Sequence, residues 1–200
     1  MTTKDKELIR LYGEFLVGFE FIFSKIRFSI LYLLYPNYDA IQKNLCEIMT
    51  EGLTADQLRK KFIALIIERF TKKSDVYKSV QCINKLLPDL IELRNSFAHG
   101  TLFVGEHDFI HETKRGHLAV RHPKLKSEGL DLNFKSFNRK LLKSLIESIH
   151  KIRNAALKMT IIIKLEKVNA NATRKFHDAI QNDLAPINIK LLLNQTIIKK

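Results

Sequence analysis

Residues 74–100, SDVYKSVQCINKLLPDLIELRNSFAHG, carry the pattern that decides the fold. Ser74 is a favourable helix N-cap residue, and Gly100 is favourable just beyond a helix C-terminus. Between them, apolar residues recur in steps of three and four, the spacing of one helix face; they are Val76, Val80, Ile83, Leu86, Leu87, Leu90, Leu93 and Phe97. The stretch therefore predicts one amphipathic helix ending at Gly100.

Two long amphipathic helices are predicted on either side of this stretch. Apolar residues keep helical spacing from about Asp5 to Leu34 and again from about Ser136 to Lys167. Pro36 and the following Asn37 end the first of these helices. We expect the two long helices to pack along each other.

Shorter helices complete the predicted bundle. Ala40–Met49 is helical in pattern, and Thr54 with Gln57 three residues later has the form of a capping box for a helix that reaches about Phe70. Beyond residue 167, a terminal helix and a short appendage are predicted from Phe176, Ile180, Leu184, Pro186 and the run Ile189–Leu193.

Residues 101–134 have a different character. Short, partly alternating runs at 101–104, 108–112 and 117–121 are separated by glycines, which favours a small β-hairpin or an ordered loop. The sequence therefore predicts an all-α protein, a bundle of two long and two or three shorter helices over residues 1–167 with this hairpin or loop as an insertion at about 101–134. Residues 168–200 are expected to form a C-terminal helical appendage packed on the same domain.

The charge balance of the chain indicates a polyanionic partner. Lys and Arg number 34 against 21 Asp and Glu, which gives a formal net charge of +13 over 200 residues. Such a long-range field attracts nucleic acid, although a generic cationic surface is the simpler alternative. RNA is the partner that the rest of the sequence favours.

The sequence argues against a disulfide framework and a membrane span. Cys46 and Cys82 are the only cysteines and lie far apart, so neither a disulfide framework nor a thiolate zinc site is predicted. The apolar stretch Phe15–Tyr35 is interrupted by three charged residues, Glu20, Lys25 and Arg27. With no cleavage-site pattern near the N-terminus, we expect a cytoplasmic protein with no membrane segment.

Three polar side chains gather at the end of the predicted helix 74–100. On a helical wheel of about 100° per residue, Arg94 falls inside the apolar arc. A guanidinium cannot lose its charge, so it needs a partner there or a face that is not plain core. Asn95 and His99 lie beside each other at the edge of the arc. Arg94, Asn95 and His99 can therefore converge on one point and hold a phosphate.

These residues carry a resemblance to a known family. Leu-Arg-Asn-Ser-Phe-Ala-His-Gly at residues 93–100 resembles the Arg-Asn-x-x-x-His signature of HEPN domains, the helical nucleases of toxin–antitoxin, abortive-infection and CRISPR systems. The resemblance covers this motif and the layout of helices over about residues 5–167. Arg153 and Asn154 begin in the same way, but Lys158 stands where the motif has His, so no site is assigned there.

The resemblance implies a metal-independent endoribonuclease without cofactors, acting as a toxin or antiviral defence effector. The ribose 2′-hydroxyl would attack the adjacent phosphate and leave a 2′,3′-cyclic phosphate and a 5′-hydroxyl. His99 would be general acid or base, because imidazole exchanges protons near neutral pH. Arg94 would stabilise the phosphorane oxygens, and Asn95 would orient His99 or the phosphate.

The resemblance also implies partners. Two copies of the motif face each other across a homodimer in this family, and an antitoxin or other regulatory protein holds such nucleases silent. The apolar arc from Leu86 to Phe97 is then expected to pack against its own copy, with the two-fold axis near Arg94. The alternative is a non-catalytic module that binds RNA or a nucleotide and serves as a scaffold or partner subunit.

Residues 107–126 are rich in histidines and cations. His107, His111, His117 and His122 are dense enough to raise the question of a metal, but no cysteine is near and the acids have no ligand spacing, so no metal is predicted. The cations are expected to contact RNA phosphates, a solvated charge run being the alternative; they are Lys114, Arg115, Arg121, Lys124 and Lys126. Tyr32, Tyr35 and Tyr38 can stack on bases, although packing against the protein is the simpler interpretation.

Overall fold

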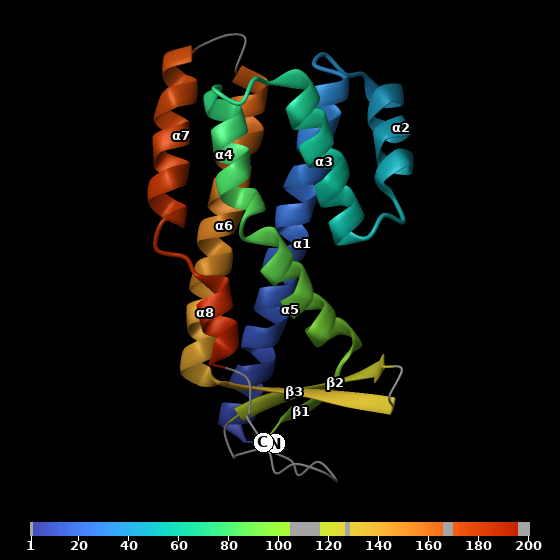
Figure 1. The fold of residues 1–200 in the computed structure, drawn as a ribbon, viewed down its shortest axis with the longest axis vertical. Helices are drawn as coiled ribbons and strands as arrows, with labels where there is room; N and C mark the ends of the chain where they lie inside the picture. The colour runs from blue at the N-terminus through green and yellow to red at the C-terminus, as the bar shows by residue number, and fades with distance from the viewer. Residues whose placement is uncertain (1, 105–116, 127–128, 166–169, 196–200) are drawn as a thin grey trace. The chain divides into compact units, whose positions relative to one another are not determined.

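The computed structural model describes residues 2–104, 117–126, 129–165 and 170–195, and gives the backbone alone for 122–126, 129–134 and 170. This part of the chain holds eight helices and one three-stranded sheet (Figure 1). In chain order the elements are α1 (Thr3–Leu34), α2 (Ala40–Thr50), α3 (Ala55–Arg69), α4 (Asp75–Asn84), α5 (Leu87–His99), β1 (Thr101–Val104), β2 (His117–Lys126), β3 (Gly129–Asn138), α6 (Arg139–Leu165), α7 (Ala170–Leu184) and α8 (Ile189–Asn194). The prediction of a mainly helical protein with a small β insertion is confirmed.

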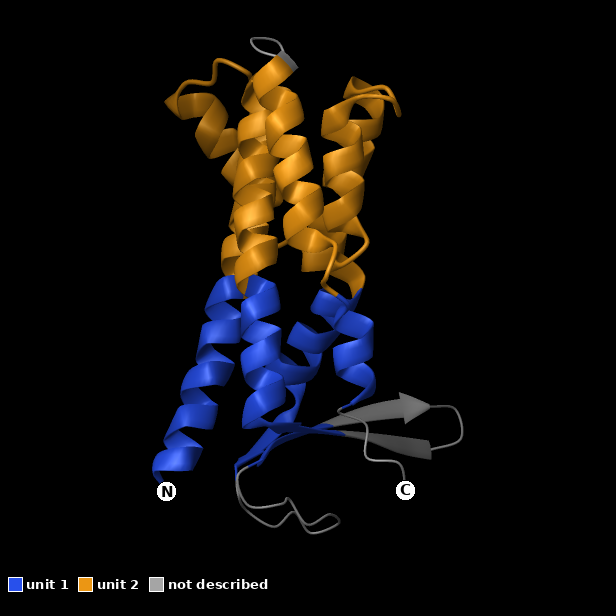
Figure 2. Ribbon diagram, turned by 90° about the vertical axis from the view of Figure 1, so that its left-hand side faces the viewer, with its two compact units in different colours: residues 1–18, 89–149, 188–200 blue, residues 19–88, 150–187 orange. Residues whose placement is uncertain are grey.

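The chain divides into two compact units, each built from separate segments and coloured in Figure 2. Unit 1 contains residues 1–18, 89–149 and 188–200, and unit 2 contains residues 19–88 and 150–187. The divisions fall inside α1 and α6, in the first turn of α5, and between α7 and α8. The boundary expected at residues 167 and 168 lies outside the described residues.

Local capping explains where several helices begin. The Thr54 hydroxyl accepts from the Gln57 N–H at 3.3 Å, and the Gln57 side chain accepts from the Thr54 N–H at 2.9 Å. Ser74 caps α4 by accepting from the Tyr77 N–H at 3.1 Å. Both predicted caps are confirmed, because a cap joins groups only three residues apart. Asp39 and Gln42 form a second capping box at the start of α2.

The stretch at residues 74–100 forms two helices, so the prediction of one continuous helix was wrong. α4 ends at Asn84, and α5 begins at Leu87. Pro88 accounts for the break, because a proline has no N–H for the carbonyl of residue 84 and its ring would clash with that carbonyl. In the first turn of α5 that N–H is not needed.

The sheet has the order β1-β2-β3 with both pairs antiparallel. β3 continues to Asn138, so the predicted helix start at Ser136 was wrong. The Asn138 side chain caps α6 by accepting from the Leu141 N–H at 2.8 Å. The Ser136 hydroxyl instead lies 3.0 Å from Nδ1 of His117 on β2. The run predicted at residues 108–112 lies outside the described residues.

In unit 1, the first part of α1 packs along the first part of α6. The Arg139 guanidinium lies 2.7 Å from the Glu7 carboxylate. Gly18 is buried and touches Ile149 so closely that a Cβ there would lie 2.2 Å from the Ile149 side chain. The glycine therefore permits close approach of the two helices in this unit.

In unit 2, the remaining parts of α1 and α6 also lie together, as expected from the sequence. The buried hydroxyls of Ser29 and Thr160 are 3.0 Å apart. α7 packs on α4, where Nδ1 of buried His177 lies 2.7 Å from the Ser79 hydroxyl. That hydroxyl donates its one proton to the Asp75 carbonyl, so the imidazole N–H is the donor to Ser79. We interpret this pair as a structural contact that holds α7.

α1 carries the apolar stretch that raised the question of a membrane span. Its buried aromatic side chains include Phe15, Phe19 and Phe23, while Glu20 is exposed. Among the described residues, no helix is both long enough and apolar enough to cross a membrane.

Candidate functional site

Arg94, Asn95 and His99 lie on the last two turns of α5 in unit 1. Asn95 and His99 are exposed, and Arg94 is half-buried instead of enclosed by the apolar arc. His99 is the last residue of the helix, and the chain turns into β1 after Gly100 (Figure 1). The motif therefore combines one buried residue, Phe97, with polar side chains that point out of the core.

Phe97 anchors this end of α5. Its ring makes edge contacts with three aromatic rings, at centroid distances of 5.2 Å to Tyr12, 5.1 Å to Phe15 and 5.0 Å to Phe137. The Tyr12 hydroxyl also donates to the Phe97 carbonyl at 3.3 Å, which satisfies one of the carbonyls left over at a helix end. α1 and β3 thus hold the motif helix in place from the core side.

Gly100 was predicted to end the helix as a C-terminal capping residue, but its role in the structure is different. Its φ is not positive, so it is not the left-handed residue that often ends a helix. A Cβ at this position would lie 2.4 Å from the Val120 side chain and 2.5 Å from the Ser96 carbonyl. The glycine is required because β2 approaches the end of α5 closely.

Lys135 on β3 is a site residue that sequence reasoning missed. Its ammonium lies 3.2 Å from the Glu92 carboxylate and 3.4 Å from the Ser96 hydroxyl, and its side chain is only 14% exposed. Glu92, Asn95 and His99 share one face of α5 by their spacing of three and four residues. Lys135 therefore places a largely buried positive charge beside the face that carries the motif. No sequence signal links Lys135 to Glu92, because their contact depends on the register of β3.

Of the five cations predicted to bind RNA, one has a described side chain. The Arg121 guanidinium lies over the Phe103 ring at 5.4 Å. Lys124 and Lys126 are on β2, but only their backbone is described, and Lys114 and Arg115 lie outside the described residues.

The histidine-rich region is described only in part. His117 contacts Ser136, the side chain of His122 is not described, and His107 and His111 lie outside the described residues. Within the described part of the chain, no group of three or more His, Cys, Asp or Glu side chains could hold a metal ion.

The apolar arc of α5 is not available to a second copy of the chain. Leu87, Leu90, Leu93 and Phe97 are at most 2% exposed within a single chain. The expectation that this arc forms the dimer interface was therefore wrong, because the arc is already covered by the core of its own protomer. Homodimerisation itself stays a prediction, and it would use exposed residues such as Asn95, Ala98 and His99.

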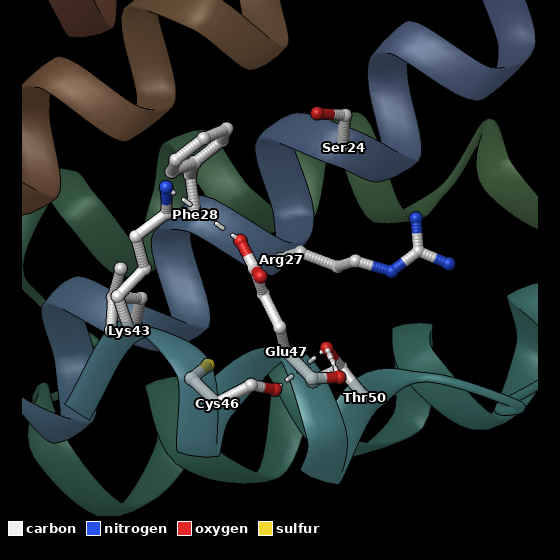
Figure 3. A pocket seen from close by; sticks show the side chains of 8 residues that line it. Ser24, Arg27, Phe28, Lys43, Cys46, Glu47 and Thr50 are labelled. Atoms are coloured by element: carbon white, nitrogen blue, oxygen red, sulfur yellow. Dashed lines mark hydrogen bonds and ion pairs between the residues drawn. The ribbon is translucent and has the colours of Figure 1, made fainter. Parts of the chain in front are cut away.

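A pocket of about 110 Å³ lies between α1 and α2 in unit 2 (Figure 3). Phe28 and Lys43 lie close together on one side of it, and the Arg27 guanidinium points away from the Glu47 carboxylate. Burial, together with the charge of Glu47, raises the pKa of the Cys46 thiol in its wall. A raised pKa lowers the fraction of thiolate at neutral pH, so Cys46 is a poor nucleophile in this pocket.

The chain was compared with protein-family models, with curated proteins and with solved structures. None of the three comparisons found a match. The resemblance to HEPN domains therefore stays a prediction from the sequence, based on the residues from Arg94 to His99 and on the helix layout that the sequence predicts.

Proposed function

We propose that this protein is a metal-independent endoribonuclease of a toxin–antitoxin or phage-defence system, with Arg94, Asn95 and His99 as its catalytic residues. The observation that carries the proposal is the placement of this motif. Asn95 and His99 are exposed at the end of a helix whose intervening Phe97 is fixed in the core. The excess of 34 basic over 21 acidic residues supplies the field that attracts RNA.

The chemistry is an in-line displacement at phosphorus. The 2′-oxygen forms a bond to the phosphorus as the bond to the 5′-oxygen breaks, which leaves a 2′,3′-cyclic phosphate and a 5′-hydroxyl. One proton leaves the 2′-hydroxyl and one is delivered to the departing 5′-oxygen, and His99 can perform either transfer. A single imidazole cannot be base and acid at the same moment, so a second copy of His99 across a homodimer would supply the other transfer.

The remaining side chains stabilise charge and geometry. Arg94 provides a fixed positive charge and several N–H donors for the oxygens of the phosphorane. Asn95 lies one helical turn before His99 and can hold the imidazole or the phosphate by hydrogen bonding. Lys135 adds positive charge beside the same face, although Glu92 offsets part of it.

The test is incubation of the purified protein with a labelled RNA in the presence of EDTA. Fragments that end in 2′,3′-cyclic phosphate are expected, and the His99→Ala variant should produce none. A requirement for added divalent metal in the cutting step would contradict the proposal. RNA that is bound and never cut would assign the protein to the alternative class, a non-catalytic binding module.

The shared site has its own test. Light scattering should report a dimer at micromolar concentration, and an Ala98→Cys variant in a Cys82→Ser background should cross-link between chains because residue 98 is exposed beside His99. A stable monomer that cleaves RNA would contradict the transfer of one proton by each copy.

A further inference from the structure

α1 carries a second aromatic face in unit 2, separate from the one in the core. Phe21, Lys25, Phe28 and Tyr32 follow one another at spacings of four, three and four residues, so they share one side of the helix. The core side of the same segment carries Phe19 and Phe23, whose rings are 4.7 Å apart and buried. The rings of the outer face are half-buried or exposed, and Phe28 is 36% exposed.

Cations from two helices cover the rings of this face. The Lys25 ammonium lies 4.8 Å from the Phe21 ring centroid and 5.2 Å from that of Phe28. α6 adds the Arg153 guanidinium at 5.3 Å from the Phe21 ring and the Lys164 ammonium at 5.4 Å from the Tyr32 ring. We call these six residues the aromatic–cationic stripe: Phe21, Lys25, Phe28, Tyr32, Arg153 and Lys164.

In the part of the chain that the structure describes, the cations of the stripe are held by rings and not by carboxylates. Among the described residues, none of Lys25, Arg153 and Lys164 makes an ion pair with a carboxylate, whereas Lys158 on the same helix lies 2.6 Å from Asp183. A cation held only by the face of a ring keeps its hydrogen-bond donors available to an anion. The stripe therefore offers both positive charge and aromatic surface to a ligand.

We propose that the aromatic–cationic stripe binds a single-stranded polynucleotide. Bases stack on the rings of Phe21, Phe28 and Tyr32, and phosphates accept hydrogen bonds from Lys25, Arg153 and Lys164. On binding, the two ammonium groups and the Arg153 guanidinium move from the ring faces to the phosphates, which exposes the rings to the bases. A duplex does not fit this description, because its bases are already stacked on one another.

The length of the stripe suits several nucleotides. Tyr32 lies eleven positions after Phe21, which corresponds to about 16 Å along a helix. Rings and ammonium groups do not read the 2′-hydroxyl, so single-stranded RNA and DNA should bind alike. The stripe goes beyond the proposed cleavage at His99, since its chemistry involves none of the motif residues.

The test measures binding and not cleavage. The proposal for the stripe can therefore hold even if the protein does not cleave RNA. The full chain with His99→Ala is titrated against a fluorescein-labelled oligouridine of about 12 nucleotides at several salt concentrations, with fluorescence anisotropy as the readout. The stripe variant carries Lys25→Gln, Arg153→Gln and Lys164→Gln, and it should bind the oligonucleotide more weakly. The slope of log Kd against log salt should fall by about 2, because each of the three lost phosphate contacts contributes about 0.7 to that slope.

A matched triple variant controls for net charge. Lys72→Gln, Lys73→Gln and Lys175→Gln remove three exposed cations from the same unit and should leave the salt slope unchanged. Phe28→Leu keeps an apolar side chain but removes the ring, so it should weaken binding about tenfold with the salt slope unchanged. Circular dichroism checks that each variant keeps its helices.

Four outcomes would overturn the proposal. The parent protein fails to bind the oligonucleotide, both triple variants lose the same affinity, or a duplex of equal length binds as tightly as the single strand. The fourth outcome is that the stripe variant loses binding to vesicles of anionic lipid while its affinity for the oligonucleotide is unchanged, which would assign the stripe to a membrane surface.

Discussion

The chain contains two Arg-Asn pairs on helices, and the structure treats them differently. Arg94 and Asn95 precede His99, which is the exposed last residue of α5. Arg153 and Asn154 precede Lys158 in the interior of the 27-residue α6. The Lys158 ammonium lies 2.6 Å from Asp183 on α7, and the Arg153 guanidinium lies over the Phe21 ring.

The difference teaches that the dipeptide alone does not make a site. The first pair stands where a helix ends and its neighbour His99 is exposed, next to a sheet that brings Lys135 close. The second pair stands in mid-helix, and the residue at the position of His99 is held in an ion pair. Three predictions test how far this contrast extends.

The largest effect is expected at His99. Replacement by Ala should lower the rate of RNA cleavage by about a hundred- to ten-thousandfold, because a positioned general acid or base contributes that much. The measurement is the initial rate on a labelled RNA in EDTA, with circular dichroism to verify the helices.

Lys158 provides the matched control for His99. Lys158→Ala should leave the rate unchanged, and the double variant His99→Ala with Lys158→His should not recover cleavage, although it rebuilds the motif spacing in α6. Recovered cleavage would mean that the spacing is sufficient without a helix end.

A smaller effect, on stability, is expected at Phe97. Phe97→Ala removes a ring that is 2% exposed and that contacts three others, so the free energy of unfolding should fall by about 3–5 kcal/mol. Leu157 lies four residues after Arg153 and is 42% exposed, so Leu157→Ala should cost less than about 1 kcal/mol. Urea unfolding followed by circular dichroism measures both, and equal losses would refute the assignment of Phe97 as the anchor.

The smallest effect is expected from the ion pair of the second Arg-Asn segment. Lys158→Met removes the contact with Asp183, in which both side chains are partly exposed to solvent, and should lower the free energy of unfolding by at most about 1 kcal/mol. The loss should shrink in high salt, because salt screens such pairs. A large decrease in the free energy of unfolding that does not depend on salt would contradict this prediction. It would show that the ion pair is needed to hold α7 against α6.

Features that depend on neighbouring residues were predictable from the sequence. The caps at Thr54 and Ser74 join atoms three residues apart, so composition and spacing suffice to find them. The break before α5 was missed because apolar spacing continues across it, with Leu87 and Leu90 both buried. Pro88 was the available signal, since a proline is disfavoured anywhere but the first turn of a helix.

Features that depend on the sheet could not be predicted in this way. Ser136 and Asn138 are both suitable caps for α6. In the structure Asn138 caps the helix, while Ser136 belongs to β3 and contacts His117 on another strand. Lys135 reaches Glu92 only because β3 lies beside α5. For the site, the motif residues were found from their order, whereas the reason for Gly100 is the approach of β2.

Unit 1 is built from three separate segments of the chain, and this has a consequence for folding during translation. The unit includes α8, whose Ile189 and Leu193 are buried, yet the motif at residues 94–99 is synthesised about ninety residues earlier. Domains form during translation from the N-terminus onward as their residues emerge from the ribosome. A nascent chain that already contains His99 therefore still lacks part of the core of its unit, and the motif helix acquires its complete surroundings only when α8 has been translated.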